Sequence, residues 1–315
     1  MKNFILKNKK TVYDLMNDTH KELLWGLRLI NIEDTWENIT QEELSKVKVA
    51  IVDSGIDSEH EDLRNMVHKG YNFIDNTTNT QDNFGHGTRI AGIIGAERNN
   101  GIGIAGVASG VKLIPLKVID GRGRGDIKNV VRALEWCIEN QVDIINLSIG
   151  YQRNEIDILT NKNSIYYYKE QELIERALKN NITVVSSVGN GYGKAMQYPA
   201  AYPGVISVAS CGICSKPFTL YCATKNNKCN GNTIYAPGEY IFTTDVGNKY
   251  SYDFGSSMAC GFITGAVSLL KAKRIKLTST QIHLMLLENA NTIEIGNKSI
   301  KFLNVDKAFN ALKTI

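Results

Sequence analysis

The chain has 315 residues, 43% hydrophobic and 22% charged, so it is long enough for a large α/β domain with a sizeable buried core. Its formal net charge is +4, without a dense block of lysine and arginine, which argues against nucleic acid as a partner. No stretch approaches the roughly 18 apolar residues of a membrane span, and no apolar core of a secretory signal follows the basic N-terminus. We therefore expect no membrane partner and a cytoplasmic location, or an extracellular one if the chain is a processed form.

Beyond residue 46 the chain alternates between short apolar runs and segments of helical period. The runs are typical of strands buried on both faces and cover 47–53, 111–119, 142–148, 182–188 and 204–210. Helical spacing covers 88–96, 126–140, 169–180, 257–273, 279–289 and 304–312. This alternation predicts an α/β fold, with one parallel β-sheet flanked by helices on both faces.

Four polar residues stand within two positions of a glycine at the ends of these elements. Asp53 closes an apolar strand, where a buried carboxylate is unfavourable unless it is paired, and Asn190 follows another strand. His86 and Ser257 lie at the start of helical segments. Taken singly, each has an ordinary structural alternative: a turn for Asp53 and Asn190, a satisfied structural residue for His86 and a helix cap for Ser257.

Together, these residues form a recognisable set. Asp, His and Ser follow one another in "VAIVDSGID", "GHGTRIAG" and "GSSMA", and this order and these motifs resemble the subtilisin-like serine proteases (the subtilase family, peptidase S8). The resemblance extends to "INLSIG", "YPAAYPGVISV" and "IYAPGEYIFTT". It implies a subtilisin-like, three-layer catalytic domain over 25–315, preceded by a short lead segment over 1–24.

The resemblance also implies an activity, that of a serine endopeptidase acting through an acyl-enzyme. Ser257 would be the nucleophile, His86 the general base, and Asp53 the group that orients His86. Asn190 would donate its side-chain amide to the oxyanion, together with the backbone N–H of Ser257. Ser256 is expected to cap the helix that Ser257 enters.

Two segments resemble the edges that hold a peptide substrate in extended form. They contain Ser148, Ile149 and Gly150, and Gly125 in the glycine-rich run 120–126; a mobile loop is the alternative for that run. Backbone pairing of this kind accepts many peptide sequences. The expected partner is therefore a peptide or protein substrate, and the chain is expected to be a monomer.

The motifs depart from the family pattern at four positions, none of them in the triad. Gly261 and Phe262 stand where the family usually has Pro-His, Ser256 stands where it has Thr, and Arg89 stands where a second histidine is frequent. Glycine inside a helix costs roughly 1 kcal/mol relative to alanine, so Gly261 predicts a slightly looser nucleophile helix.

Two segments contain residue types that bind metal ions. The segment "ERNNGIGIAGV" resembles the calcium loop of the family, in which Asn100 and Asp62 would supply oxygen ligands; satisfied turns are the alternative. The second segment contains four cysteines, Cys211, Cys214, Cys222 and Cys229. Four thiolates can bind zinc tetrahedrally, but free thiols are the favoured interpretation and disulfides are a further alternative.

Two alternative hypotheses accompany the general protease, a narrower one and one from another class of function. The chain could be a maturation protease that removes the leader of a modified peptide such as a lanthipeptide, which suits the absence of a signal peptide in the sequence. It could also be a catalytically inactive subtilase that serves as a binding module. The intact set Asp53, His86, Asn190 and Ser257 argues against the inactive form.

Overall fold

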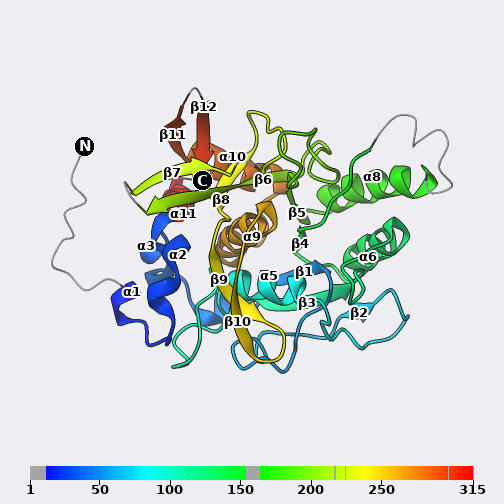
Figure 1. The fold of residues 1–315 in the computed structure, drawn as a ribbon, viewed down its shortest axis with the longest axis horizontal. Helices are drawn as coiled ribbons and strands as arrows, with labels where there is room; N and C mark the ends of the chain where they lie inside the picture. The colour runs from blue at the N-terminus through cyan, green and yellow to red at the C-terminus, as the bar shows by residue number, and fades with distance from the viewer. Residues whose placement is uncertain (1–11, 154–163, 216–217, 224, 297, 315) are drawn as a thin grey trace.

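A computed structural model describes residues 12–153, 164–215, 218–223, 225–296 and 298–314 (Figure 1). In this part of the chain a sheet of ten strands runs in the order β11-β12-β8-β6-β5-β4-β1-β3-β2, with β7 paired to β6, and β9 and β10 form a separate hairpin. The strands are β1 (Lys48–Asp53), β2 (Tyr71–Asn72), β3 (Lys112–Lys117), β4 (Ile144–Leu147), β5 (Thr183–Ser187), β6 (Ile206–Ser215), β7 (Phe218–Cys222), β8 (Ile234–Pro237), β9 (Ile241–Asp245), β10 (Lys249–Asp253), β11 (Asn291–Ile295) and β12 (Lys298–Phe302).

The helices follow the predicted periodicity closely after residue 85. Those of the body are α5 (His86–Gly95), α6 (Ile127–Glu139), α8 (Ser164–Lys179), α9 (Ser256–Lys273), α10 (Ser279–Glu288) and α11 (Val305–Asn310). Short helices precede and end it, namely α1 (Val12–Leu15), η1 (Lys21–Leu23), α2 (Trp25–Leu29), α3 (Glu33–Glu37), α4 (Gln41–Leu44) and η2 (Ala311–Thr314). None of the described helices is long and apolar enough to cross a membrane.

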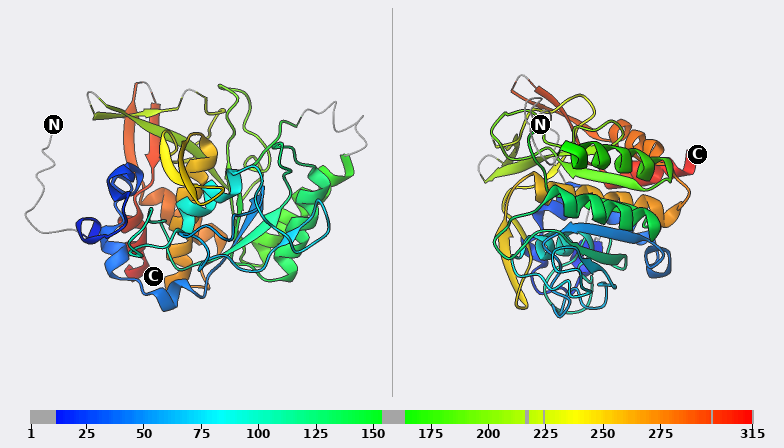
Figure 2. Two further views of the ribbon diagram at one scale, coloured as in Figure 1. Left: turned by 60° about the horizontal axis from the view of Figure 1, so that its bottom comes forward. Right: turned by 90° about the vertical axis from the view of Figure 1, so that its right-hand side faces the viewer.

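Two apolar cores lie on opposite faces of the sheet, and strand β1 shows why. Its alternate side chains Val49 and Ile51 join the core under α5 and α9, whereas Ala50 and Val52 join the core under α6 and α8, because successive residues of a strand point to opposite faces. Figures 1 and 2 show the resulting three layers, with α6 and α8 side by side. The predicted three-layer α/β architecture is confirmed.

The sheet is mixed, and this refines the prediction of a parallel one. The central strands β3, β1, β4, β5, β6 and β8 pair in parallel, whereas β7 and β11 are antiparallel to their neighbours. The sequence did not predict β2 or the strands from β7 to β12, because these strands are only two to five residues long and several of them, such as β10 and β11, are half-exposed. The sequence expectation for 204–210 covers only the first half of β6.

The described part of the expected lead segment packs against the body of the protein. Tyr13 and Met16 are buried in the larger core, and the backbone N–H of His20 donates to the carbonyl of Gly103 over 2.8 Å. Residues 1–11 lie outside the described residues. A boundary between residues 24 and 25 stays a prediction.

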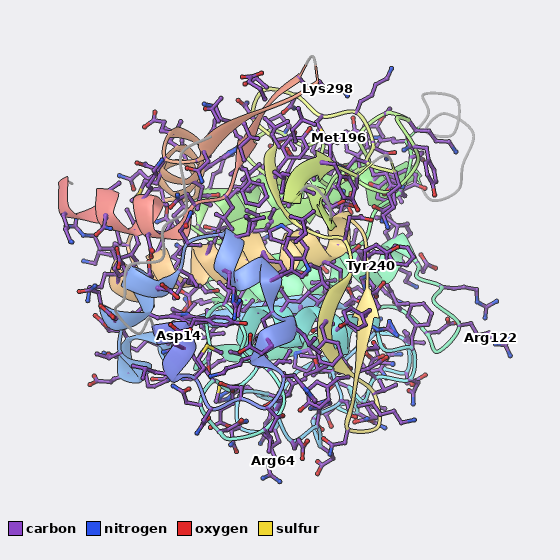
Figure 3. The ribbon with its side chains drawn as sticks, turned by 60° about the vertical axis from the view of Figure 1, so that its left-hand side comes forward. Asp14, Arg64, Arg122, Met196, Tyr240 and Lys298 are labelled. Carbon is purple, nitrogen blue, oxygen red and sulfur yellow. The ribbon has the colours of Figure 1, made fainter. Side chains whose placement is uncertain are left out.

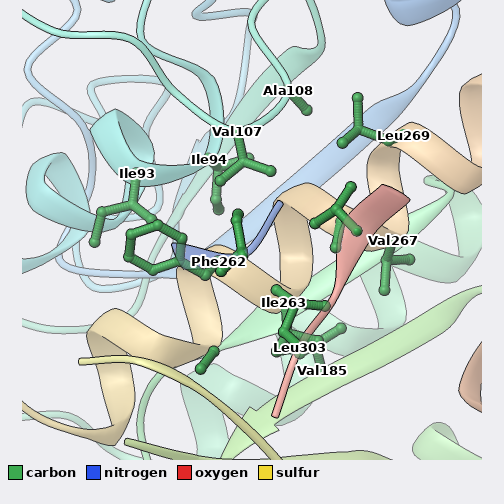
Figure 4. Packing of buried hydrophobic residues seen from close by; sticks show 14 of the residues in the cluster. Ile93, Ile94, Val107, Ala108, Val185, Phe262, Ile263, Val267, Leu269 and Leu303 are labelled. Carbon is green, nitrogen blue, oxygen red and sulfur yellow. The ribbon is translucent and has the colours of Figure 1, made fainter. Parts of the chain in front are cut away.

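Helix α9 carries the two departures Gly261 and Phe262 into the centre of the core. Gly261 packs closely on α5, since a Cβ built there would lie 3.0 Å from Ile93 Cγ2, so the glycine allows the two helices to approach. The Phe262 side chain is 4% exposed and lies beside Ile93 (Figure 4), filling the space next to Gly26 in α2, where a built Cβ would be only 2.6 Å from Phe262 Cζ.

Phe262→Ala should therefore destabilise the protein strongly. Removing a fully buried phenylalanine costs about 3–5 kcal/mol, through lost transfer energy and the cavity left behind. Urea denaturation measures this free energy of unfolding. Phe254→Ala is the matched control, because Phe254 is 60% exposed; equal effects of the two substitutions would contradict the packing role of Phe262.

Candidate active site

Asp53 and His86 lie in direct contact at the carboxyl end of β1. Asp53 is the last residue of β1 and is fully buried, and His86 is the first residue of α5. His86 Nδ1 lies 2.9 Å from both carboxylate oxygens of Asp53. Asp53 Oδ1 also accepts the backbone N–H of Ser54 at 2.7 Å, so the buried carboxylate is satisfied by protein donors.

Glycines allow the histidine helix to reach the strand. A Cβ built on Gly87 would lie 2.1 Å from the carbonyl oxygen of Gly55, which only a residue without a side chain tolerates. Gly85 precedes His86 at φ +100°, a left-handed conformation that favours glycine. The motif "GHG" therefore reflects close approach of backbone to backbone.

Asp82 fixes this approach, although the sequence motifs did not predict a role for it. Its Oδ1 accepts the backbone N–H of Phe84 and Gly85, and its Oδ2 accepts both the N–H and the hydroxyl of Thr88. A carboxylate at a helix N-terminus satisfies free N–H groups and complements the helix dipole. The aspartate three residues before the glycine of "DNFGHGT" was the available signal.

Nearby charges shift the pKa of His86, whose side chain is 19% exposed. Burial by itself lowers the pKa of His86, but the nearby Asp53 carboxylate and its hydrogen bond raise it, and the net direction is upward. Asp253 acts in the same direction and Arg89 opposes it. Arg89 is in turn held by Asp245 and Asp253, at 3.3 and 3.5 Å.

Ser257 lies at the second position of α9 and is 9% exposed. Its hydroxyl donates to the carbonyl oxygen of Ser148 over 3.0 Å, and Ser148 and His86 line one cleft. Among the described residues, no hydrogen bond joins Ser257 to His86. In proteins without substrate such bonds are commonly long and tighten only when the substrate binds.

Asn190 is fixed by the residue before Ser257. Its Oδ1 accepts the backbone N–H of Ser256 at 3.0 Å and the Ser256 hydroxyl at 3.1 Å, and that hydroxyl accepts the N–H of Gly189 at 3.2 Å. Because a backbone N–H can only donate, this contact identifies the oxygen of the Asn190 amide and leaves Nδ2 as its donor.

The expectation that Ser256 caps α9 is wrong. The N-cap residue is Gly255, and no side chain caps this helix. The Ser256 hydroxyl instead joins the Gly189 backbone to Asn190. A helix cap and a hydrogen-bonded link between Gly189 and Asn190 both require a hydroxyl at the start of the helix. Only the tertiary contacts therefore distinguish the two roles.

The four residues predicted to bind substrate lie in one cleft. Gly125, Ser148, Ile149 and Gly150 line a cavity of about 630 Å³ together with His86. Its other walls include Tyr167, and also Tyr151, Glu170 and Pro199, which the sequence did not predict. Burial raises the pKa of Glu170 to about 7, and its Oε2 accepts the hydroxyls of Tyr151 and Tyr202.

The two residues predicted to bind calcium contact each other. Asn100 Nδ2 donates to Asp62 Oδ1 over 2.7 Å, and Asp62 Oδ2 accepts the N–H of Ile104 and the hydroxyl of Tyr250. Asn100 Oδ1 accepts the N–H of Ile102. Protein donors thus already bond to these oxygens in this conformation, and a calcium site stays a prediction.

The cysteine group gives no metal centre in the described part of the chain. No set of three or more histidine, cysteine, aspartate or glutamate side chains is placed there to hold a metal ion. Cys211, Cys222 and Cys229 are free thiols, and the side chain of Cys214 lies outside the described residues. Zinc at these cysteines stays a prediction.

Comparison with known proteins places the chain in a protein family. The model of the subtilase family matches residues 45–310. The major intracellular serine protease of Bacillus subtilis is 31% identical over 290 residues, covering 87% of this chain and 85% of that protein. Subtilisin E of the same organism is 34% identical over 243 residues, covering 76% of this chain and 58% of that protein.

Solved structures similar to this one support the same family. Fervidolysin from Fervidobacterium pennivorans, a keratinolytic enzyme related to subtilisin, aligns with a TM-score of 0.79 and 26% identity, over 97% of this chain and 48% of that one. A cold-adapted subtilisin-like serine proteinase shares the fold, with a TM-score of 0.74. The chain belongs to the subtilase family. It is a serine endopeptidase, a hydrolase that acts on peptides or proteins.

Proposed function

We propose that the protein hydrolyses peptide bonds with Ser257, His86 and Asp53 as a catalytic triad, through an acyl-enzyme intermediate. The contact between His86 Nδ1 and both Asp53 oxygens, at 2.9 Å, carries this proposal. It orients the imidazole so that Nε2 is free to accept a proton, and it favours the cationic imidazole that proton transfer creates.

In the proposed reaction Ser257 Oγ attacks the substrate carbonyl carbon while His86 Nε2 accepts its proton. A serine hydroxyl is a weak nucleophile at neutral pH and needs such a base. His86 then donates the proton to the leaving amine, and a water molecule hydrolyses the acyl-enzyme by the same sequence of transfers. Asp53 stays ionised throughout.

The oxyanion would be held by two donors. The backbone N–H of Ser257 lies at the start of α9, where the helix dipole also favours negative charge. Asn190 Nδ2 is the second donor, since Ser256 holds the other atom of that amide. Fixed donors of this kind stabilise the charge that develops in the transition state more than the substrate itself.

The substrate would lie extended in the cleft between the segment containing Gly125 and the segment 148–150. Both segments line the same cavity as His86, and Ser148 is tied to Ser257 in both directions, by hydrogen bonds of 3.0 and 3.3 Å. A peptide paired with this segment would therefore place its carbonyl carbon near Ser257 Oγ.

Labelling with a fluorophosphonate probe tests the nucleophile. The wild-type protein should bind the probe covalently at Ser257, and Ser257→Ala should not. Peptide mapping by mass spectrometry locates the adduct. A probe adduct on another serine, or none on the wild-type protein, would contradict the proposed mechanism.

Activity should depend on pH through His86. Protonated imidazole cannot accept the serine proton, so kcat/KM falls as pH drops through a pKa that lies above the ordinary 6.5 of histidine. Asp253→Asn removes a negative charge that raises this pKa and leaves Arg89 less neutralised. Both effects lower the pKa of His86, so the acidic limb of the kcat/KM profile should move by a few tenths of a unit toward lower pH.

The control for this profile is Glu294→Gln. It removes one negative charge from an exposed position of β11, remote in sequence from the triad, and should leave the profile unchanged. A shift of the limb toward higher pH in Asp253→Asn, or an equal shift in both variants, would contradict the electrostatic account.

Three finer predictions concern the substrate, the location and the oligomeric state: removal of a leader peptide, a cytoplasmic location and a monomer. The intracellular location in the name of the Bacillus subtilis relative supports the cytoplasmic location. Cleavage profiling with a peptide library separates broad from narrow specificity, and a single dominant cleavage sequence would support a maturation protease. Sedimentation of the purified protein measures the oligomeric state.

A further inference from the structure

Two cysteines face each other across strands β6 and β7. Cys211 and Cys222 are direct partners in the antiparallel register of these strands. Neither thiol has a role in the proposed hydrolysis. Both are free cysteines in the structure, and the fold holds them side by side.

The hydrogen-bond pattern brings their side chains close together. The neighbouring pair is bonded, since the N–H of Ala223 donates to the carbonyl of Ser210 over 3.1 Å. The carbonyl of Cys211 points the other way and accepts the N–H of Gly238. Because bonded and non-bonded pairs alternate along an antiparallel ladder, Cys211 and Cys222 form a non-bonded pair, in which Cα atoms are about 4.5 Å apart. This separation lies within the range that a disulfide requires.

The two thiols differ in access. Cys211 is fully buried, whereas Cys222 is half-buried and lines a surface cavity of about 670 Å³. Lys298, the first residue of β12, lines the same cavity and is exposed on the β11–β12 hairpin (Figure 3). A reagent in this cavity meets Cys222 first.

The pKa values of the two thiols differ in the same direction as their access. The hydrogen bond between the thiols lowers the pKa of Cys222 and raises that of Cys211, and the positive charge of Lys298 lowers the pKa of Cys222 further. The remaining described cysteines are less reactive, since burial raises the pKa of Cys137, Cys229 and Cys260. The thiolate is the nucleophilic form of cysteine.

We propose that Cys211 and Cys222 are a dithiol–disulfide pair, in which Cys222 reacts with a hydroperoxide and Cys211 resolves the product. The Cys222 thiolate attacks one peroxide oxygen, the O–O bond breaks, and the leaving oxygen takes up a proton. Cys211 sulfur then attacks the sulfur of the Cys222 sulfenic acid, the S–O bond breaks, and water leaves with the proton of Cys211. The two thiols supply the two electrons that reduce the peroxide.

This pair is connected to the loop that carries Asn190. The segment after Cys222 holds that loop by backbone hydrogen bonds, from Tyr192 N–H to the Lys225 carbonyl and from Gly193 N–H to the Asn226 carbonyl. The Asn227 side chain completes the support, as its Oδ1 accepts the N–H of Gly191 and its Nδ2 donates to the Val188 carbonyl. A disulfide at Cys222 would restrain the start of this segment. The link to catalysis rests on the proposed role of Asn190, whereas formation of the disulfide does not.

Disulfide mapping in the Ser257→Ala protein tests the proposal without self-digestion and without dependence on protease activity. The reduced protein is treated with hydrogen peroxide, remaining thiols are blocked with N-ethylmaleimide, and non-reduced peptides are analysed by mass spectrometry. We expect a Cys211–Cys222 bond and a Tm higher by several degrees, because the bond restricts the unfolded chain. A bond from Cys222 to another cysteine, or unchanged thiols, would overturn the proposal.

Two further variants distinguish the roles of the thiols. Cys211→Ala should leave a sulfenic acid on Cys222 that dimedone captures, and Cys222→Ser should abolish both the disulfide and dimedone capture. Cys229→Ala is the matched control and should still form the bond, since its thiol donates to the carbonyl of Asn227. Circular dichroism verifies that each variant is folded. Dimedone capture at Cys211 in the Cys222→Ser protein would contradict the assigned order of reaction.

Discussion

Ser257→Ala should lower kcat for a peptide substrate by about 10⁴-fold or more, the loss typical when a triad residue is disabled. Alanine removes the only atom at this position that can form the acyl-enzyme, while the oxyanion donors and the cleft remain. The KM should change little, because Ser257 Oγ contributes little to binding the ground state. Initial rates with a fluorogenic peptide measure both constants.

Ser45→Ala is the matched control for this substitution. Ser45 is exposed at the end of α4, and its hydroxyl donates only to the nearby Glu42 carbonyl. Its activity should equal that of the wild type. A Ser257→Ala protein that retains wild-type kcat would show that another residue performs the attack.

Asn190→Ala should lower kcat by about 10²–10³, the range known from removal of one such donor in a subtilisin. The effect should fall on kcat more than on KM, because the amide bonds to charge that develops in the transition state. Steady-state kinetics on one peptide substrate provide the measurement. An unchanged kcat would place the oxyanion elsewhere.

A substitution of Ser256 tests the same positioning of Asn190 and should have a smaller effect than Asn190→Ala. Ser256→Ala removes the hydroxyl that joins Gly189 to Asn190 but leaves the backbone N–H that binds Asn190 Oδ1. Its loss in kcat should therefore be smaller than that of Asn190→Ala, and Ser256→Thr, which retains a hydroxyl, should recover most of the activity. If Ser256→Ala were the more damaging of the two, positioning through Asn190 would not explain the result.

Strong local patterns predicted most of the fold. The buried strands β1, β3, β4 and β5 read as continuous apolar runs, and α6 and α9 have regular helical spacing, so both classes could be located to within a few residues. Strand β7 and the hairpins β9–β10 and β11–β12 could not, because half-exposed antiparallel strands depend on which neighbour covers each face. Cys211 opposite Cys222 is a fact of register that no spacing along the chain contains.

The candidate site also has a part that the sequence predicted and a part that only the structure revealed. The sequence by itself determined which residues are chemically able to act, since Asp53, His86 and Ser257 stand in glycine-marked motifs whose residue types match the chemistry. Only the tertiary structure decided how they are held. Asp82 accepts the free N–H groups at the start of α5, and Ser256 hydrogen-bonds to Asn190 instead of capping its own helix. The reason is physical. Motifs reflect local backbone demands, such as the close approach at Gly87, whereas hydrogen-bond partners are chosen by which polar groups burial brings within reach.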